Sequence, residues 1–255
     1  MPFTGKTVLV TGAARGIGRA VADAFGKAGA SVAVCDIDGA AAAEAAAGVE
    51  AVAATGTGAR AVGVQLDVSD SASVGRGVKE VTEALGPVDV LVNNAGFDVV
   101  GPFTESTEGD WDRLLEVNLK GQIICARAVL DGMTARGGGK IVNIASDAGK
   151  VGSTGEVVYS ATKGGVIAFT KALAREVARA GITVNCVCPG PTETALLAQV
   201  ADWNERVYNS IAKAIPLRRT AQPADVAPAV VFLASDGADY ITGQALSVSG
   251  GLTMS

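Results

Sequence analysis

Seven short runs of apolar residues recur along the chain and alternate with segments of helical pattern. The runs are apolar almost from end to end, as expected for strands that are covered on both faces. Strands that alternate with crossover helices predict an α/β fold with a doubly wound parallel sheet of the Rossmann type and helices on both faces. No linker or repeat interrupts this rhythm, so residues 1–255 are predicted to form a single domain. The predicted strands lie within residues 6–12, 31–36, 61–68, 88–96, 140–146, 182–190 and 245–251.

Two segments between the predicted strands have a distinct composition. Residues 38–56 are rich in alanine and are predicted to form a plain surface helix. Residues 191–221 are the long segment that departs from the strand and helix rhythm, and they precede the last predicted strand. A segment at this place is suited to act as a mobile lid, and we predict a substrate lid here.

Composition and charge narrow the functional classes. Hydrophobic residues make up 49% of the chain and charged residues 18%, which favours a large core over disorder. A net charge of −5, without basic runs, argues against nucleic acid or an anionic membrane as a partner. No apolar run reaches the length of about 18 residues needed for a membrane span, and the chain begins directly with a strand-like pattern. We therefore expect a cytoplasmic protein without signal peptide or membrane anchor.

Histidine is absent, which excludes Ser-His-Asp catalysis, histidine zinc sites and imidazole acid/base chemistry. The four cysteines are Cys35, Cys125, Cys186 and Cys188, and none forms a C-x-x-C pair. Cys186 and Cys188 alternate along a predicted strand, so we expect them to point to the same face. Buried thiols in a reducing compartment are predicted rather than a disulfide or a metal site.

A glycine cluster follows the first predicted strand and opens the first predicted helix. Gly12, Gly16 and Gly18 suit a tight turn whose amides approach a pyrophosphate at a helix N-terminus. Asp36 ends the second predicted strand, where a carboxylate accepts hydrogen bonds from an adenosine ribose and repels a 2′-phosphate. Arg15 in the glycine loop argues in the other direction, because a guanidinium attracts that phosphate. We expect Asp36 to prevail and predict NAD as the cofactor.

Polar residues follow three further predicted strands, at the edge of the sheet where ligands of such folds bind. Asp67 follows the third strand, where it is also interpretable as a helix cap. The NNAG motif at 93–96 follows three apolar residues and indicates close approach to a sugar or ring. Ser146 follows the fifth strand, and a simple turn cap is its alternative interpretation.

Tyr159 and Lys163 stand four positions apart in a segment of small and apolar residues with helical character. At this spacing the two side chains lie on one face of a helix and can meet. For an isolated pair, a half-buried tyrosine beside a lysine that reaches solvent is the simpler interpretation. Which interpretation holds depends on the other residues that the chain places near the pair.

Together these motifs resemble the short-chain dehydrogenase/reductase family in its single-domain form, over essentially the whole chain. The resemblance rests on TGAARGIG, NNAG, Asn118, Ser146, YSATK and PGPTET in that order. It implies that Tyr159 is the general acid/base and that Lys163 lowers the tyrosine pKa and holds the nicotinamide ribose. It also implies that Ser146 orients the substrate oxygen and that Asn118 holds a water in a proton relay.

The resemblance also implies a set of residues that bind the dinucleotide. These are Gly12, Arg15, Gly16, Ile17 and Gly18 at the pyrophosphate, Asp36 at the adenosine ribose, Asp67 and Val68 at the adenine, Asn94, Ala95 and Gly96 at a ribose-facing turn, Tyr159 and Lys163 at the nicotinamide ribose, and Pro189, Gly190, Thr192 and Thr194 at the nicotinamide.

The magnitudes allow the tyrosine to act near neutral pH. The pKa of tyrosine must fall by about 3 units from about 10, which corresponds to about 4 kcal/mol. One ammonium group at about 4 Å contributes on the order of 4 kcal/mol at an effective dielectric constant of about 20. Burial opposes this effect, so we expect the positive charge of oxidised nicotinamide to help.

The predicted reaction is hydride transfer from a secondary alcohol to NAD, with Tyr159 taking the proton. The resemblance is closest to members that oxidise a cyclic 2-hydroxyacyl-CoA of the 2-hydroxycyclohexanecarboxyl-CoA type, and it further implies a homotetramer. The predicted substrate contacts are Ser146, Asp147, Ser153, Glu156 and Tyr159, and Asp98 is a further candidate for lining the pocket. Solvated loop polarity is the alternative interpretation of the acidic residues and Ser153. Two alternative functions stay open: a reductase of ketones or 3-oxoacyl thioesters, which should prefer NADPH, and a regulator that senses dinucleotides without turnover.

Overall fold

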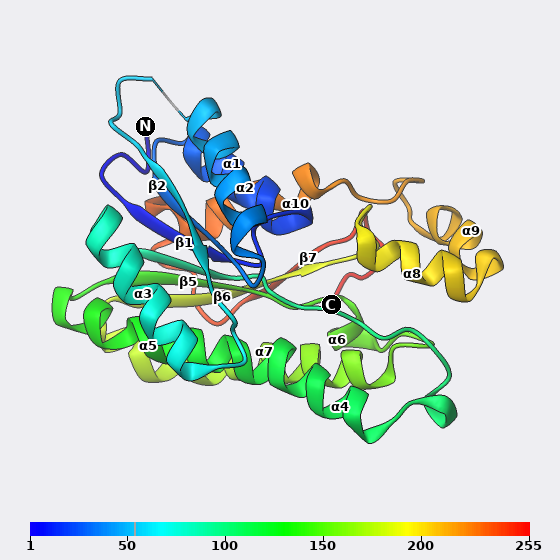
Figure 1. Ribbon diagram of the computed structural model, residues 1–255. Coiled ribbons are helices and arrows are strands. Elements are labelled where there is room, and N and C mark those ends of the chain that lie inside the picture. Colours follow the sequence, from blue (N-terminus) through cyan, green and yellow to red (C-terminus); the bar gives the residue numbers. More distant parts are fainter. Residues whose placement is uncertain (54) are drawn as a thin grey trace.

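The computed structural model describes residues 1–53 and 55–255. One parallel sheet runs through it in the strand order β3-β2-β1-β4-β5-β6-β7, which confirms the doubly wound parallel sheet (Figure 1). The strands are β1 (Thr7–Thr11), β2 (Ser31–Asp36), β3 (Ala61–Gln65), β4 (Val90–Asn93), β5 (Gly139–Ile144), β6 (Ile182–Pro189) and β7 (Ala245–Val248).

Helices connect the strands and cover both faces of the sheet. The α-helices are α1 (Gly16–Lys27), α2 (Gly39–Val52), α3 (Ser71–Leu85), α4 (Glu108–Leu115), α5 (Gly121–Arg136), α6 (Ala148–Val151), α7 (Val157–Val177), α8 (Ala195–Trp203), α9 (Glu205–Ala214) and α10 (Pro223–Ala234). Shorter 3-10 turns are η1 (Phe103–Glu105), η3 (Ala178–Ala180) and η4 (Asp236–Ala238), and η2 (Glu116–Lys120) is a π-helix between α4 and α5. Within the described part of the chain, no helix is both long and apolar enough to cross a bilayer.

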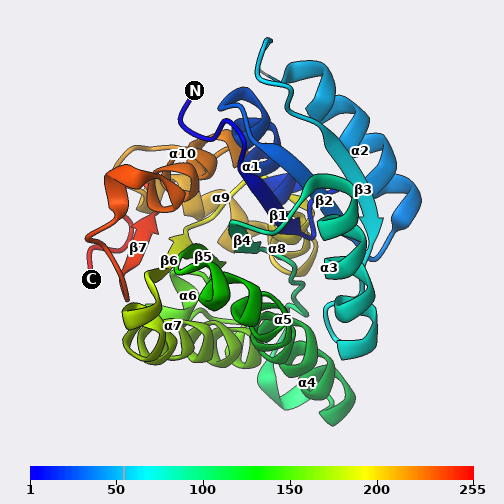
Figure 2. The same ribbon diagram turned by 90° about the vertical axis from the view of Figure 1, so that its left-hand side faces the viewer.

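The strands are apolar because their side chains alternate between two hydrophobic cores, one on each face of the sheet. Val8 and Val10 of β1 pack into the core beneath α1, α2 and α10, whereas Leu9 between them packs into the core beneath α3, α5 and α7. The same alternation recurs in β2. Figure 2 shows the two helical layers on opposite sides of the sheet. Burial on both faces therefore explains the continuous apolar runs in the sequence.

Local signals at the helix ends agree with the helices that form. The alanine-rich segment gives α2, and its N-cap Asp38 accepts a hydrogen bond from the Ala41 amide at 3.0 Å. Position 54, within the predicted span 38–56, lies outside the described residues. Thr107 and Asp110 form a capping box at the start of α4.

The segment 191–221 carries α8 and α9 and projects beyond the sheet near its carboxyl edge (Figure 1). Its two ends are tied together, because Thr192 forms a parallel bridge with Ala221 and the Glu193 amide donates to the Ala221 carbonyl at 2.8 Å. At the far end of α8, the Trp203 ring covers Gly155, where a Cβ atom would lie 2.8 Å from the ring. The projecting segment thus contacts the loop before Tyr159, and its role as a lid stays a prediction.

Candidate active site

Ser146, Tyr159 and Lys163 meet at the carboxyl edge of the sheet. Ser146 follows β5, and Tyr159 lies in the first turn of α7, one turn before Lys163. The Ser146 hydroxyl hydrogen-bonds the Tyr159 phenol and also accepts from the Ala148 amide at 3.1 Å. The Lys163 Nζ atom lies 5.5 Å from the centroid of the Tyr159 ring. The structure therefore brings together the three groups that the sequence predicted to act together.

Lys163 does not reach solvent, so the simpler interpretation of the pair is wrong. Its side chain is 3% exposed, and Nζ donates to the Ile144 carbonyl at 3.0 Å. The same carbonyl accepts from the Gln122 amide at 3.1 Å. A buried ammonium held at the end of β5 has a fixed position beside the phenol, which a solvent-exposed lysine would lack.

A close backbone contact sets the distance between Ser146 and α7. A Cβ atom at Gly149 would lie 2.5 Å from the Lys163 carbonyl carbon, so a larger residue would push α6 away from α7. Because Gly149 lies in the short helix that follows Ser146, this contact positions the serine against the tyrosine.

Burial dominates the ionisation of the pair. It raises the pKa of Tyr159 above its ordinary value; Asp98 and Glu156 add to this rise and the hydrogen bond from Ser146 opposes it. Burial also lowers the pKa of Lys163 to about 8. The polypeptide alone therefore does not make the phenol acidic. Burial thus opposes ionisation of the phenol, as expected from the sequence.

The glycine loop after β1 packs directly against the turn after β4, with no room for a side chain between the two backbones. Gly12 and Gly16 have positive φ values of 60° and 59°, which favour glycine. A Cβ atom at Gly12 would lie 2.8 Å from the Ala95 Cα, and one at Gly18 would lie 2.4 Å from the Asn94 Nδ2. Glycine is thus required for the contact between loop and turn, while the N-terminus of α1 is left facing the sheet edge.

The NNAG turn has a structural role that the sequence did not reveal. Asn94 Nδ2 donates to the main-chain carbonyls of Thr11 and Gly12, each at 2.9 Å. The Thr11 hydroxyl accepts from the main-chain amides of Asn94 and Ala95 at 3.0 and 3.1 Å. These bonds tie the end of β4 to the end of β1, so the Asn94 side chain is engaged with the glycine loop.

The acidic residues at the ends of β2 and β3 are ordered by backbone amides. Asp36 accepts from the Ala14 amide at 3.1 Å and from the Asp38 amide at 3.2 Å, which fixes its carboxylate beside the glycine loop. Asp67 accepts from the amide and hydroxyl of Ser69 at 2.9 and 2.6 Å. The N-cap of α3 is Asp70 rather than Asp67, so the helix-cap interpretation of Asp67 is wrong.

Asn118 is fully buried in the π-helix η2. Its Oδ1 accepts from the Phe97 amide at 3.0 Å, and its Nδ2 donates to the Phe97 carbonyl at 2.8 Å. Between this side chain and Lys163 lies Gly96, where a Cβ atom would be 3.1 Å from Asn118 Oδ1 and 3.4 Å from Lys163 Nζ. Asn118 therefore fixes the turn after β4 directly beside the lysine, in a π-helical segment of a kind often found at functional sites.

The predicted substrate contacts have different environments. Asp147 is buried and accepts from the Ser247 hydroxyl of β7 at 2.7 Å, so its carboxylate is engaged with β7. The Ser153 amide donates to the Ser160 hydroxyl at 3.2 Å. Glu156 immediately precedes α7 and hydrogen-bonds Asp98, which is 5% exposed. Of these acidic residues, Asp98 and Glu156 act electrostatically on Tyr159.

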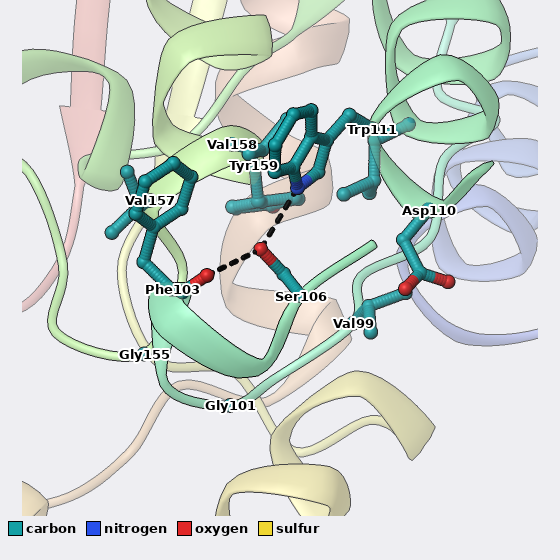
Figure 3. A pocket seen from close by; sticks show the side chains of 11 residues that line it. Val99, Gly101, Phe103, Ser106, Asp110, Trp111, Gly155, Val157, Val158 and Tyr159 are labelled. Carbon is teal, nitrogen blue, oxygen red and sulfur yellow. Dashed lines mark hydrogen bonds between the residues drawn. The ribbon is translucent and has the colours of Figure 1, made fainter. Parts of the chain in front are cut away.

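A narrow slot of about 20 Å³ opens beside Tyr159 and Val158 (Figure 3). Phe103 and Trp111 form one wall and stack with ring centroids 5.6 Å apart. The Trp111 indole donates to the Ser106 hydroxyl at 2.8 Å, which in turn donates to the Phe103 carbonyl at 2.7 Å. The slot places an apolar wall next to the phenol and is large enough for about one water molecule.

Cys186 and Cys188 point to the same face of β6, with their Sγ atoms 3.8 Å apart, and all four cysteines are free and buried as predicted.

The sequence did not predict a buried network of side-chain amides behind the site. Asn93 Nδ2 donates to Asn143 Oδ1 at 2.9 Å, and Asn143 Nδ2 donates to the Thr170 hydroxyl at 2.8 Å. An asparagine in the middle of the apolar run 140–146 was the available signal. Among residues 1–53 and 55–255, no group of three or more His, Cys, Asp or Glu residues is arranged to hold a metal ion.

Comparison with known proteins agrees with this arrangement. Residues 12–253 match the family described as enoyl-(acyl carrier protein) reductase. The chain is 39% identical over 254 residues to the (2S)-[(R)-hydroxy(phenyl)methyl]succinyl-CoA dehydrogenase subunit BbsD of Thauera aromatica, covering 100% of this chain and 99% of the relative. It is 42% identical over 250 residues to the acetoacetyl-CoA reductase of Allochromatium vinosum, covering 98% and 99% of the two chains.

A crystal structure described as a short-chain alcohol dehydrogenase from Sinorhizobium meliloti 1021 superimposes with a TM-score of 0.91 at 40% identity, covering 98% of this chain and 97% of that one. The chain belongs to the short-chain dehydrogenase/reductase family. It is accordingly an oxidoreductase of a family that uses nicotinamide cofactors. In this chain, the three residues on which the family resemblance rests, Ser146, Tyr159 and Lys163, lie together at the carboxyl edge of the sheet.

Proposed function

We propose that this short-chain dehydrogenase/reductase oxidises a secondary alcohol to a ketone with NAD, and that its substrate is a cyclic 2-hydroxyacyl-CoA of the 2-hydroxycyclohexanecarboxyl-CoA type. The observation that carries the proposal is the position of Ser146 and of the buried Lys163 ammonium beside the Tyr159 phenol. A structural pair has no need of an ammonium that is withdrawn from water beside a phenol.

The residues of the chain fit a dinucleotide. No side chain caps the N-terminus of α1, and the loop before it contains Gly12 and Gly16 at positive φ, which suits a pyrophosphate. The carboxylate of Asp36 is held beside this loop by two amides, which suits an adenosine ribose with a free 2′-hydroxyl and favours NAD over NADP. The remaining proposed cofactor contacts are Arg15, Ile17, Asp67, Val68, Asn94, Ala95, Gly96, Pro189, Gly190, Thr192 and Thr194.

The bound nicotinamide would supply a hydride acceptor and, in its oxidised form, a positive charge beside Tyr159 in addition to that of Lys163. In the proposed mechanism, Ser146 donates a hydrogen bond that orients the substrate oxygen. The Tyr159 phenolate takes the hydroxyl proton of the substrate. Lys163, anchored on the Ile144 carbonyl, stabilises that phenolate. Asn118 holds the Phe97 backbone, and with it the wall of the site next to Lys163.

Two relatives support a coenzyme A thioester as the substrate class. BbsD is part of a dehydrogenase of a substituted succinyl-CoA, and the Allochromatium enzyme is an acetoacetyl-CoA reductase. In the substrates that these two names give, a hydroxyl or oxo group and a thioester are present in the same molecule. The experiment is to follow NADH formation at 340 nm with 2-hydroxycyclohexanecarboxyl-CoA and with simple cyclic alcohols. Turnover of the thioester supports the proposal, and turnover of the alcohols alone contradicts it.

A second candidate function is reduction of a 3-oxoacyl thioester with NADPH. Its support is the similarity to acetoacetyl-CoA reductase and to the 3-oxoacyl-[acyl-carrier-protein] reductase FabG of Vibrio harveyi, which is 39% identical. Comparing kcat/KM for NADH and NADPH with the same oxo thioester separates the two functions. Preference for NADPH would favour the reductase and contradict the role given to Asp36.

We further propose that the protein is a homotetramer in the cytoplasm. Apolar side chains at the edge strand β7 and its surroundings support self-association: Leu246 is 42% exposed, Leu252 39% and Phe232 of α10 48%. Light scattering coupled to size-exclusion chromatography tests the assembly. A monomer at micromolar concentration would contradict it.

A further inference from the structure

Two carboxyl groups meet beside Tyr159 in the turn region of the site. Asp98 follows the NNAG turn, and Glu156 is the residue immediately before α7. The two side chains hydrogen-bond one another, and Asp98 Oδ1 also accepts from the Val99 amide at 2.7 Å. Asp98 is 5% exposed, whereas Glu156 is half-buried. A buried carboxyl that caps no helix and bonds a second carboxyl is a costly arrangement, and a role in the site accounts for it.

Asp98 lies between two segments that fix its surroundings, namely the π-helix η2 that carries Asn118 and the start of α7 that follows Glu156. Asn118 grips the backbone of Phe97, the preceding residue, through two hydrogen bonds. Glu156 is fixed on the other side by its place at the start of α7, three positions before Tyr159. The carboxyl pair is therefore held at a constant place relative to the phenol.

The pair imposes negative charge on the site. Burial and Glu156 raise the pKa of Asp98 to about 8, while the Val99 amide and Lys163 oppose this rise. Near neutral pH Asp98 thus holds its proton beside Glu156, and the pair as a whole is negatively charged. Both groups also raise the pKa of Tyr159, so their field is felt where the substrate oxygen must lie.

We propose that Asp98 and Glu156 form a specificity filter that rejects alcohols carrying a free carboxylate next to the reacting carbon and admits those in which this carboxyl group is masked as an ester or thioester. This inference rests on the proposed function and names the chemical form of the substrate that the site accepts. A carboxylate on the neighbouring carbon would be a second negative charge in a poorly solvated site. A thioester carbonyl at the same place is uncharged, so it does not meet this repulsion.

The expected size of the effect follows from Coulomb's law. At a separation of about 7 Å and an effective dielectric constant of about 20, the repulsion lowers kcat/KM for the anion by tenfold to a hundredfold. Salt would reduce this factor only weakly, because the pair is mostly buried.

The experiment compares methyl 2-hydroxycyclohexanecarboxylate with the free 2-hydroxy acid as substrates of the wild-type enzyme with NAD at neutral pH. The methyl ester matters because it removes the charge without adding the coenzyme A moiety. The filter requires kcat/KM for the ester to exceed that for the acid by about tenfold or more. Equal use of ester and acid would overturn it.

Variants then assign the selectivity to the pair. The double variant Asp98→Asn, Glu156→Gln removes the charge with little change of shape, and the ratio of ester to acid should fall by at least about fivefold. Glu105→Gln is the matched control, because this carboxylate lies exposed on η1, and it should leave the ratio unchanged. A folded double variant with the wild-type ratio would overturn the proposal.

Separate measurements test the specificity filter and the proposed function: relative binding or turnover of ester and acid tests the filter, and turnover of the CoA thioester tests the function. If the CoA thioester is not turned over, the proposed function fails. The filter is then still measured by titrating the NADH complex with the hydroxy ester and the hydroxy acid and following NADH fluorescence. Binding of the acid about tenfold weaker than the ester supports the filter, and equal binding overturns it.

Discussion

The substitution Asp98→Asn is predicted to change how the stability of the protein depends on pH. Asparagine keeps an oxygen that can accept from the Val99 amide, and it offers an N–H group to Glu156 in place of the shared proton. The packing of the turn is preserved and only the titration of the buried carboxyl is removed.

The sign and size of the effect come from the raised pKa of Asp98. In the unfolded chain the carboxyl has its ordinary pKa of 3.8, whereas in the folded protein it holds its proton until about pH 8. The folded state therefore binds more protons between these values, and its stability falls as the pH rises through about 4 to 8. Over the three units from pH 5 to pH 8, one such group accounts for about 2–4 kcal/mol.

The assay is urea unfolding of the wild type and of Asp98→Asn at pH 5 and pH 8. Relative to the wild type, the variant should gain about 2–4 kcal/mol of unfolding free energy between the two pH values. Glu105→Gln serves as the control and should follow the wild type, because Glu105 is exposed on η1. Parallel pH profiles for Asp98→Asn and the wild type would show that Asp98 does not hold its proton in the folded protein.

Three further predictions concern the cofactor loop and the lysine. Asp36→Asn should bring kcat/KM with NADP to within about tenfold of that with NAD, since the repulsion of a 2′-phosphate is lost; an unchanged preference would contradict the role of this carboxylate. Gly18→Ala should weaken NADH binding in a fluorescence titration by about tenfold or more, because its Cβ would lie 2.4 Å from the Gly12 carbonyl oxygen. Gly75→Ala, where no atom lies within 4 Å of the added Cβ, is its matched control and should bind NADH normally. Lys163→Met should lower kcat by about a hundredfold or more in steady-state assays, and retention of wild-type kcat would show that the buried ammonium is not needed.

The sequence predicted the sheet well because burial on both faces leaves a direct record in continuous apolar runs. The glycine loop was also predictable, since only glycine fits where Gly12 meets Ala95. The Tyr159 and Lys163 pair followed from helical spacing. Each of these features depends on residues that are close together in the sequence or on a single short motif.

Features that depend on contacts between distant segments were not predictable. The hydrogen bonds from Asn94 to the glycine loop join β4 to β1, and nothing in the local sequence of Asn94 distinguishes them from a ligand contact. Asp98 and Glu156 were both recognised as polar positions near the site. Their contact, and the resulting rise in the pKa of Asp98, follow from the way the β4 turn faces the start of α7. Burial decides the electrostatics of such groups, and burial is a property of the folded chain.

In the proposed mechanism the Tyr159 phenol transfers the proton while the chain around it holds the dinucleotide. The most direct measurement is the kcat of Tyr159→Phe for NADH formation from 2-hydroxycyclohexanecarboxyl-CoA, together with its Kd for NADH, with Tyr240→Phe as control because Tyr240 is fully exposed. We expect kcat to fall by about a hundredfold or more with an unchanged Kd, and the control to behave like the wild type. Full turnover by a Tyr159→Phe enzyme that binds NADH normally would contradict it.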